Sequence, residues 1–417
     1  MIVRLEGLDI VSRLLLATLA AGILMSANGC SSSEDAGATP ECTPATVDRF
    51  KELVVVDEGV LSDPRSKNAT AGAWSFRHHI EQLMPQGADA SEFVTSWLDG
   101  WASTRLVNGF ALDRPNEYRD AAMKSVVVCP WLQLTPENAC DADCSKCTSR
   151  KLDLARAPFR LVAIVNRMDQ REENLAEPSG EGRFVYGFTT GPADDPTSLI
   201  TRPMTVIFEY ELPKNRTTKE WAESWHALGQ FPALDEPYRA ALETVTNAFT
   251  ARGAAPGRPN GSALGQVRTN ESTLNWIWQL REFGLATDGS LRLRPVRNTP
   301  AESFNKSSAL RDWINANATT LMSTTHEVPL AMRSGSADQL QYSWSIPGVD
   351  EKLRKAFAAN TCNGCHSTEQ PSIDTAFHIS PFKQGTAKLS PFMNDPSGKP
   401  DDLGHRAESL QRALCSK

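Results

Sequence analysis

The residue types best suited to chemistry stand together late in the chain, in the run Cys362-Asn363-Gly364-Cys365-His366. With two residues between them, the two thiols can reach the two vinyl groups on one porphyrin edge and form thioethers. The imidazole in the next position can then bind the iron. The pattern C-x-x-C-H therefore predicts one covalently attached haem c, held by Cys362 and Cys365 and ligated by His366.

Three other interpretations of this cysteine pair stay open. A redox dithiol commonly opens a helix that follows a strand, whereas a helical pattern precedes Cys362. A structural disulfide would close a tight loop of two residues. Half of a metal site would need further ligands, and no second C-x-x-C with matching spacing lies near this one. Haem attachment is the favoured interpretation.

The elements expected around the motif resemble the class I cytochrome c module. A helix capped by Asp350 leads into the motif, a long loop containing Pro and Gly follows, and a second helix is expected over Asp402–Leu414. In that family the two terminal helices cross. The resemblance covers residues 346–417 and implies a small, mainly helical haem module.

The sixth iron ligand has several candidates. In the family that the module resembles, a methionine ahead of the last helix fills this position, and Met393 occupies that place. His378 is the rival and would give two histidine ligands, while His405 is a third histidine, expected at the surface. An open position is the remaining alternative. Methionine raises the reduction potential relative to histidine, and an open position permits chemistry on peroxide or another small ligand.

The N-terminus has the pattern of a signal peptide. Arg4 and Arg13 precede the apolar stretch Leu14–Met25, and small residues follow up to Gly29. This apolar stretch is too short for a permanent transmembrane helix. Gly29 and the next residue, Cys30, resemble a bacterial lipobox. That resemblance implies cleavage after residue 29 and a diacylglycerol on Cys30.

The segment after Cys30 predicts a location as well as a tether. Ser31, where some lipoproteins have Asp, implies the outer membrane as the destination by analogy with that family. Residues 30–44 are expected to form a lipidated tether, because Ser31–Thr39 is small, polar and contains glycine. Covalent haem attachment takes place outside the inner membrane, so export and the C-x-x-C-H motif agree with each other.

The remaining cysteines suggest disulfides. Of nine cysteines, Cys30 is assigned to the lipid and Cys362 and Cys365 to haem, which leaves six. An oxidising compartment favours three disulfides among them, although the sequence does not select their pairing. A structural zinc held by the four clustered thiols is the alternative. The six candidates are Cys42, Cys129, Cys140, Cys144, Cys147 and Cys415.

Residues 45–345 are expected to form a large mixed region of α+β class. Runs rich in β-branched and aromatic residues predict strands at Leu53–Val56, Ser125–Val128, Phe159–Val165, Arg183–Thr189, Met204–Leu212 and Leu291–Val296. Helical patterns fall at Ser91–Ala102, Thr218–Leu228, Glu236–Ala251 and Ser307–Met322. The order lacks a regular βαβ rhythm. No nucleophile elbow, dinucleotide fingerprint or Walker loop is present, so whether this region is an enzyme stays open.

Two groups of polar residues in this region each have a structural and a functional interpretation. His78 and His79 are adjacent, so on a helix their side chains point about 100° apart, and we expect a surface pair. A second group combines charged residues with tryptophans. We expect its tryptophans to lie in the core and its charged residues to pair with one another. The functional alternative is a binding groove beside the haem. The members of this second group are Arg268, Thr269, Asn270, Glu271, Trp276, Trp278, Arg281 and Glu282.

Composition narrows the class of protein. Hydrophobic residues make up 40% of the 417, and the net charge is −7, so a nucleic-acid partner is not expected. The runs VRTNES, QLREF and NTCNGCH resemble those of uncharacterised exported proteins of myxobacterial type. The favoured hypothesis is an exported, lipid-anchored monohaem cytochrome that exchanges electrons with a redox protein. The alternatives are a disulfide-stapled binding or structural lipoprotein without haem, and a peroxidase-like haem enzyme.

Overall fold

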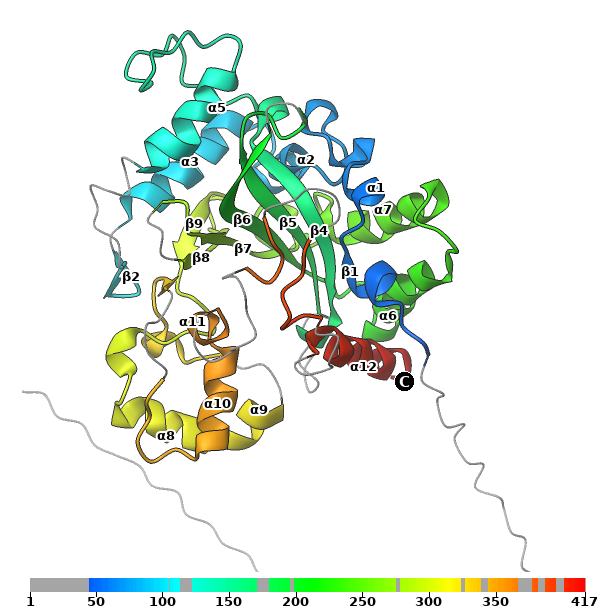
Figure 1. Ribbon diagram of the computed structural model, residues 1–417, viewed down its shortest axis with the longest axis vertical. Helices are drawn as coiled ribbons and strands as arrows, with labels where there is room; N and C mark the ends of the chain where they lie inside the picture. The colour runs from blue at the N-terminus through cyan, green and yellow to red at the C-terminus, as the bar shows by residue number, and fades with distance from the viewer. Residues whose placement is uncertain are drawn as a thin grey trace, which may run out of the picture. The chain divides into compact units, whose positions relative to one another are not determined.

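The computed structural model describes residues 45–104, 106–112, 122–170, 180–195, 199–274, 278–323, 327–338, 344–366, 377–381, 387–394 and 401–416. Residues 44–417 form one compact unit, and helices and strands alternate along it without a βαβ rhythm (Figure 1). The predicted α+β class is confirmed. Among the described residues, we find no helix with the length and apolar character needed to span a bilayer.

One large antiparallel sheet organises the fold. Its strands follow the order β1-β4-β5-β6-β7-β8-β10, and β9 pairs with β8. The four long strands β4 to β7 are neighbours in the same order as in the sequence, and β8 continues the series. The bounds are β1 Val54–Val55, β4 Phe159–Arg167, β5 Glu181–Thr190, β6 Ile200–Glu211, β7 Leu264–Glu271, β8 Gln279–Leu285, β9 Leu291–Arg294 and β10 Ala337–Asp338; β2 Leu106–Val107 and β3 Phe110–Ala111 form a separate hairpin.

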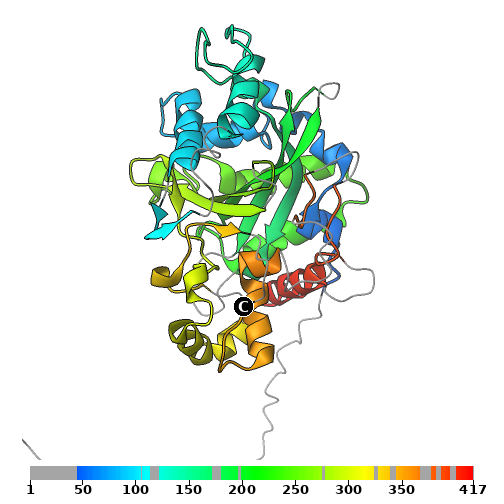
Figure 2. The same ribbon diagram turned by 60° about the vertical axis from the view of Figure 1, so that its left-hand side comes forward.

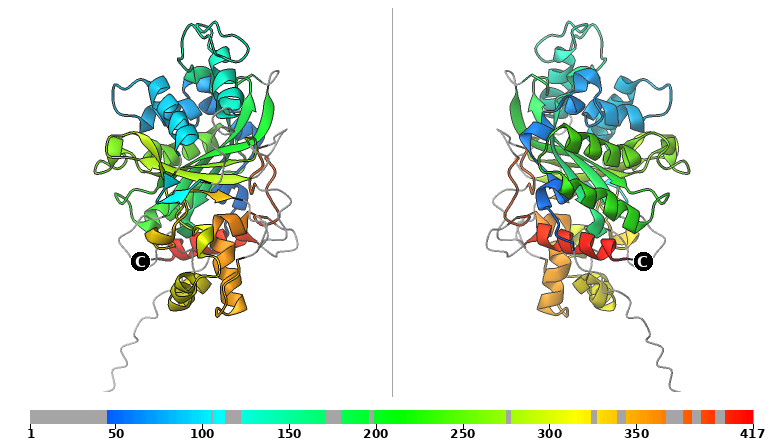
Figure 3. Two further views of the ribbon diagram at one scale, coloured as in Figure 1. Left: turned by 90° about the vertical axis from the view of Figure 1, so that its left-hand side faces the viewer. Right: turned by 90° about the vertical axis from the view of Figure 1, so that its right-hand side faces the viewer.

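Helices cover the sheet on one side, and Figure 3 places α7 on that side and residues 377–381 and 387–394 on the other. Aromatic rings fill the space under the helices. His79 and Phe76 of α2 contact Phe208, and Phe249 of α7 lies so close to β5 that a Cβ on Gly182 would collide with its ring. The helices are α1 Glu58–Leu61, α2 Phe76–Leu83, α3 Ala90–Ser103, α5 Cys129–Leu134, α6 Thr218–His226, α7 Glu236–Thr250, α8 Ser308–Ala316, α9 Ala318–Ser323, α10 Glu351–Asn360, α11 Cys362–Cys365 and α12 Asp402–Leu414.

Most of the predicted elements are confirmed, and one strand is wrong. Ser125–Val128 is part of a π-helical turn, Met123–Val128, that runs into α5. Met123 and Val127 are both buried while Ser125 is exposed. Burial four residues apart is the helical spacing, so packing overrides the β-propensity of the three valines. The sequence analysis also missed β7 and β8.

The C-terminal helices pack on different parts of the molecule. Leu353 and Phe357 of α10 join a small cluster with α8 and α9, whereas Leu403 and Leu410 of α12 join the main core. Arg49, in the turn Arg49–Leu53, donates two hydrogen bonds to Asp401, the N-cap of α12. Both helices lie at the same end of the sheet (Figure 2). The described residues of 346–417 therefore pack on the α+β region rather than apart from it, and the cytochrome c-like module stays a prediction.

Candidate functional site

The C-x-x-C-H residues form a short helix directly after α10. Thr361 separates the two helices, and its hydroxyl accepts a hydrogen bond from the Gly364 amide at 3.1 Å. Trp344 Nε1 donates to Thr361 Oγ1 at 3.1 Å and to Asn363 Oδ1 at 3.2 Å. A Cβ on Gly364 would collide with the Ala358 carbonyl oxygen, so the glycine lets α11 turn back against α10. These hydrogen bonds and the close contact at Gly364 thus fix the position of the C-x-x-C-H residues relative to α10.

Both thiols of the motif are free. Burial raises the pKa of Cys362 and of Cys365, so each is a neutral thiol at physiological pH. Cys365 Sγ lies 3.2 Å from His378 Nε2, and the Cys362 amide donates to Thr299 Oγ1 at 3.0 Å. The free thiols do not support a structural disulfide between these two cysteines.

Aromatic contacts fix the two histidines of the site. The His366 ring stacks on Trp278, with centroids 4.3 Å apart and an interplanar angle of 16°. On another side it contacts His378 at 4.3 Å between centroids. His378 Nδ1 lies 3.1 Å from Ser390 Oγ, which leaves Nε2 facing Cys365. Burial lowers the pKa of His378 well below its ordinary value, and the nearby charges of His366 and two arginines act in the same direction.

Two adjoining cavities bring the predicted residues together. The smaller, about 120 Å³, is lined by His366, His378 and Met393. The larger, about 470 Å³, is lined by both thiols and both histidines. Met393 is buried, and its amide donates to the Ser390 carbonyl at 3.0 Å. Every residue predicted for haem attachment or iron ligation therefore lines one or both of these cavities, which share His366 and His378. His405 lines the larger cavity from an exposed position, as expected for a surface histidine.

The sheet supplies a charged wall to these cavities. Glu209 on β6 lies between Arg183 on β5 and Arg268 on β7, with one oxygen 3.3 Å from a nitrogen of each. Arg268 also pairs with Glu282 of β8 at 2.9 Å. Burial alone would raise the pKa of Glu209, but the two guanidiniums lower it below its ordinary value. These four side chains are paired with one another inside the protein.

The prediction made for the group of charges and tryptophans is confirmed in its main part. Arg268 pairs with Glu282, and Trp278 is fully buried. Arg268 also lines both cavities, as the functional alternative required. Trp276 lies outside the described residues. The surface pair is wrong for His79, which is fully buried with Nδ1 2.8 Å from the Tyr210 hydroxyl. Its face of α2 packs against the aromatic side of the sheet, where a ring fits.

Sequence reasoning missed Arg167, Arg183 and Arg406, which line both cavities. A weak signal was present, because Arg167 and Arg183 interrupt strands that are otherwise apolar. Only the strand register brings them to the same part of the sheet. Arg167 is opposite Glu181, two residues before Arg183 on β5, and Arg183 is opposite Glu209. Arg406 comes from α12, far away in the sequence.

Comparison of the chain with protein-family models, curated proteins and solved structures finds no match in any of the three. The assignment of a function therefore depends on the residues of the site.

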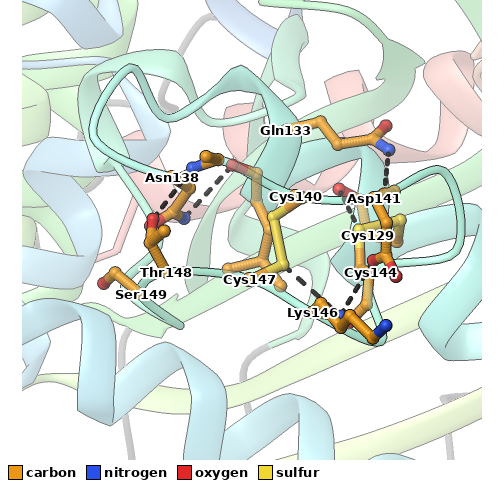
Figure 4. The surroundings of a disulfide bond; sticks show 12 residues. Cys129, Gln133, Asn138, Cys140, Asp141, Cys144, Lys146, Cys147, Thr148 and Ser149 are labelled. Atoms are coloured by element: carbon orange, nitrogen blue, oxygen red, sulfur yellow. Dashed lines mark hydrogen bonds between the residues drawn. A yellow bond between two sulfur atoms is a disulfide. The ribbon is translucent and has the colours of Figure 1, made fainter.

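Four of the other cysteines, Cys129, Cys140, Cys144 and Cys147, form a second cluster, shown in Figure 4. Disulfides join Cys129 to Cys144 and Cys140 to Cys147. The sulfur atoms of Cys140, Cys144 and Cys147 lie within 4.8 Å of one another, so a zinc site here would require both bonds to be reduced. Cys415 is disulfide-bonded as well. The predictions for Cys30 and Cys42, and for residues 1–29 and 30–44, fall outside the described residues.

Proposed function

We propose that the chain is a monohaem c-type cytochrome that transfers electrons, exported and anchored to the outer membrane by a lipid on Cys30. One observation carries the proposal. Two free thiols, the adjacent His366 and two further candidate ligands, His378 and Met393, line two neighbouring cavities that share both histidines. This donor set fits a haem c: thiols for the vinyl groups, imidazole for the iron, and a choice of second ligand. When bound, the haem would supply one-electron redox chemistry at its iron.

Each residue has a distinct part in holding that group. Cys362 and Cys365 would carry the porphyrin, and His366 would ligate the iron from a ring held against Trp278. Of the two candidates for the second ligand, His378 is favoured, because Ser390 engages Nδ1 and leaves Nε2 directed toward Cys365. Met393 is the alternative. The buried charges along the sheet would tune the reduction potential and limit the access of water.

The decisive experiment is a pyridine haemochrome spectrum with an intact mass. The full chain would be produced in a host that has the cytochrome c maturation machinery. We expect a c-type spectrum and the added mass of one haem. The double variant Cys362→Ala/Cys365→Ala should lose both. The control Cys140→Ser/Cys147→Ser changes a half-buried, disulfide-bonded cysteine pair elsewhere in the chain and should keep both.

The outcomes separate the proposal from its alternatives. A colourless wild-type protein with an oxidised Cys362–Cys365 pair would leave a disulfide-stapled binding or structural lipoprotein. A haem whose spectrum changes on adding cyanide or peroxide would indicate an open position and favour the peroxidase-like enzyme. With His378 as ligand, His378→Leu should change the near-infrared magnetic circular dichroism spectrum, whereas Met393→Leu should leave it unchanged.

The lipid anchor has its own test. Wild-type protein should fractionate with membranes and carry the mass of a diacylglycerol on the mature chain, whereas Cys30→Ala should lose both properties. A protein that is soluble and unlipidated in the wild type would limit the proposal to an exported cytochrome. The redox partner is expected to be a protein, since the site is built to hold the cofactor within the fold.

A further inference from the structure

Arg406 of α12 has hydrogen-bonding capacity that the described residues do not use. The residue is 6% exposed and lines both cavities. Its Nη2 pairs with Asp402 Oδ2 at 2.6 Å. Its Nε and Nη1 are buried and have no hydrogen-bond partner within the described part of the chain. A buried cation with unused donors is costly, so such donors in native proteins usually meet a ligand, an ion or water.

The neighbouring arginines differ from Arg406 in this respect. Arg167 Nε and Nη2 donate to the two oxygens of Asp169 at 2.9 and 2.8 Å. Arg183 Nε donates to a Glu181 oxygen at 2.9 Å. Each therefore has a carboxylate of the chain against its fork. Arg406 has one such contact, and its other two buried nitrogens have no partner among the described residues.

The local charges also favour an added anion beside Arg406. Burial, together with the adjacent guanidinium of Arg167, lowers the pKa of Arg406 to about 10. The carboxylates of Asp402 and Asp169 oppose this effect only in part. An anionic oxygen beside Arg406 would stabilise its buried charge and take up the unused donors at once.

We propose that Arg406, with Arg167 beside it, forms a binding site for a ligand carboxylate inside this cavity. Guanidinium groups bind carboxylates through charge-assisted hydrogen bonds that are stronger than neutral ones. The carboxylate has two possible sources. One is a propionate of a haem attached at Cys362 and Cys365, and this version rests on the proposed function. The other is a free small carboxylic acid, which needs no haem.

The first arm of the test compares haemin with its dimethyl ester, in which both propionates are blocked. Both compounds are titrated into the full chain, produced without haem and kept reduced. Wild type should bind haemin about tenfold to a hundredfold more tightly than the ester, the effect of losing a buried hydrogen bond to a charged group. Arg406→Gln should abolish this preference, and Arg406→Lys should weaken it. Arg150→Gln changes an exposed arginine that lines neither cavity and should retain it.

The second arm uses succinate and calorimetry on haem-free and haem-loaded chains. Binding to the haem-free chain alone would identify the propionate as the natural occupant. Binding to both forms, lost in Arg406→Gln, would identify a free acid. If no haemin binds while succinate binding still depends on Arg406, the cytochrome proposal fails and the carboxylate site stands. Equal affinity of wild type for haemin and its ester, together with no succinate binding, would overturn the site. This outcome is measured on the wild-type protein alone, so it does not depend on whether a variant folds.

Discussion

The two faces of the central sheet are built on opposite principles. Along β6, the side chains of Val206, Phe208 and Tyr210 face the helices and are fully buried in an aromatic core. The intervening residues, Ile207 and Glu209, face the cavities. Alternation along a strand puts a core on one side and a site on the other. The face covered by helices stabilises the fold through its buried aromatic core. The face toward the cavities carries buried charges, whose desolvation lowers the stability.

Truncating the aromatic face should have the largest effect. Phe208 is fully buried and contacts Phe76, His79 and Tyr186. Phe208→Ala should lower the free energy of unfolding by about 3–5 kcal/mol, measured by urea denaturation. Ile207→Ala, the neighbour on the cavity face, should cost clearly less, because part of its side chain already borders empty space. Equal losses would show that both faces are packed alike and would break the comparison.

Removing a charge from the cavity face should have the next largest effect. Glu209→Gln leaves Arg183 and Arg268 without their shared carboxylate and should lower the free energy of unfolding by about 3 kcal/mol. Since the pKa of Glu209 is lowered by folding, its contribution is present above about pH 4.5 and is lost as the pH falls through the folded-state value. Glu236→Gln is the control, because this carboxylate also pairs with an arginine, Arg65, but is 65% exposed. Its loss should be much smaller, because solvent screens an exposed ion pair. A similar loss for both variants would argue against a costly buried network.

The helix face also predicts a pH effect from His79. Burial lowers the pKa of His79 well below its ordinary value of 6.5, so the folded protein holds it neutral. Its contribution is complete above pH 6.5 and is lost as the pH falls, at about 1.4 kcal/mol per pH unit. His79→Phe should reduce the slope of unfolding free energy between pH 6.5 and 5 by that amount. Tyr210→Phe removes the hydroxyl beside Nδ1 but keeps the ring buried, so its slope should match wild type. An unchanged slope in His79→Phe would show that the imidazole is hydrated.

The sequence predicts those features of the structure that neighbouring residues encode, and it does not predict those that depend on tertiary packing. The helix Asp402–Leu414 and the C-x-x-C-H motif are written in consecutive residues, and the structure has the helix with the same bounds. β7 and β8 were missed because Arg268, Glu271, Arg281 and Glu282 interrupt their apolar pattern. Those charges are tolerated only because neighbouring strands supply partners, such as Glu209 for Arg268. Arg406 reaches the cavity from a helix more than 200 residues after β5, a placement set by tertiary packing and invisible to any local pattern.

The smallest expected effect concerns the stack between the rings of Trp278 and His366. Trp278→Phe keeps a ring against the imidazole, whereas Trp278→Leu removes it. The difference in unfolding free energy between these two variants should be about 0.5–1.5 kcal/mol, the typical strength of an aromatic pair beyond its buried area. In haem-loaded protein, Trp278→Leu should also alter the electron paramagnetic resonance spectrum, because the His366 ring would lose the surface that sets its orientation. If both variants unfold at the same denaturant concentration and give the wild-type spectrum, the stack does not hold the ligand. Other contacts, such as the one with the ring of His378, would then position His366.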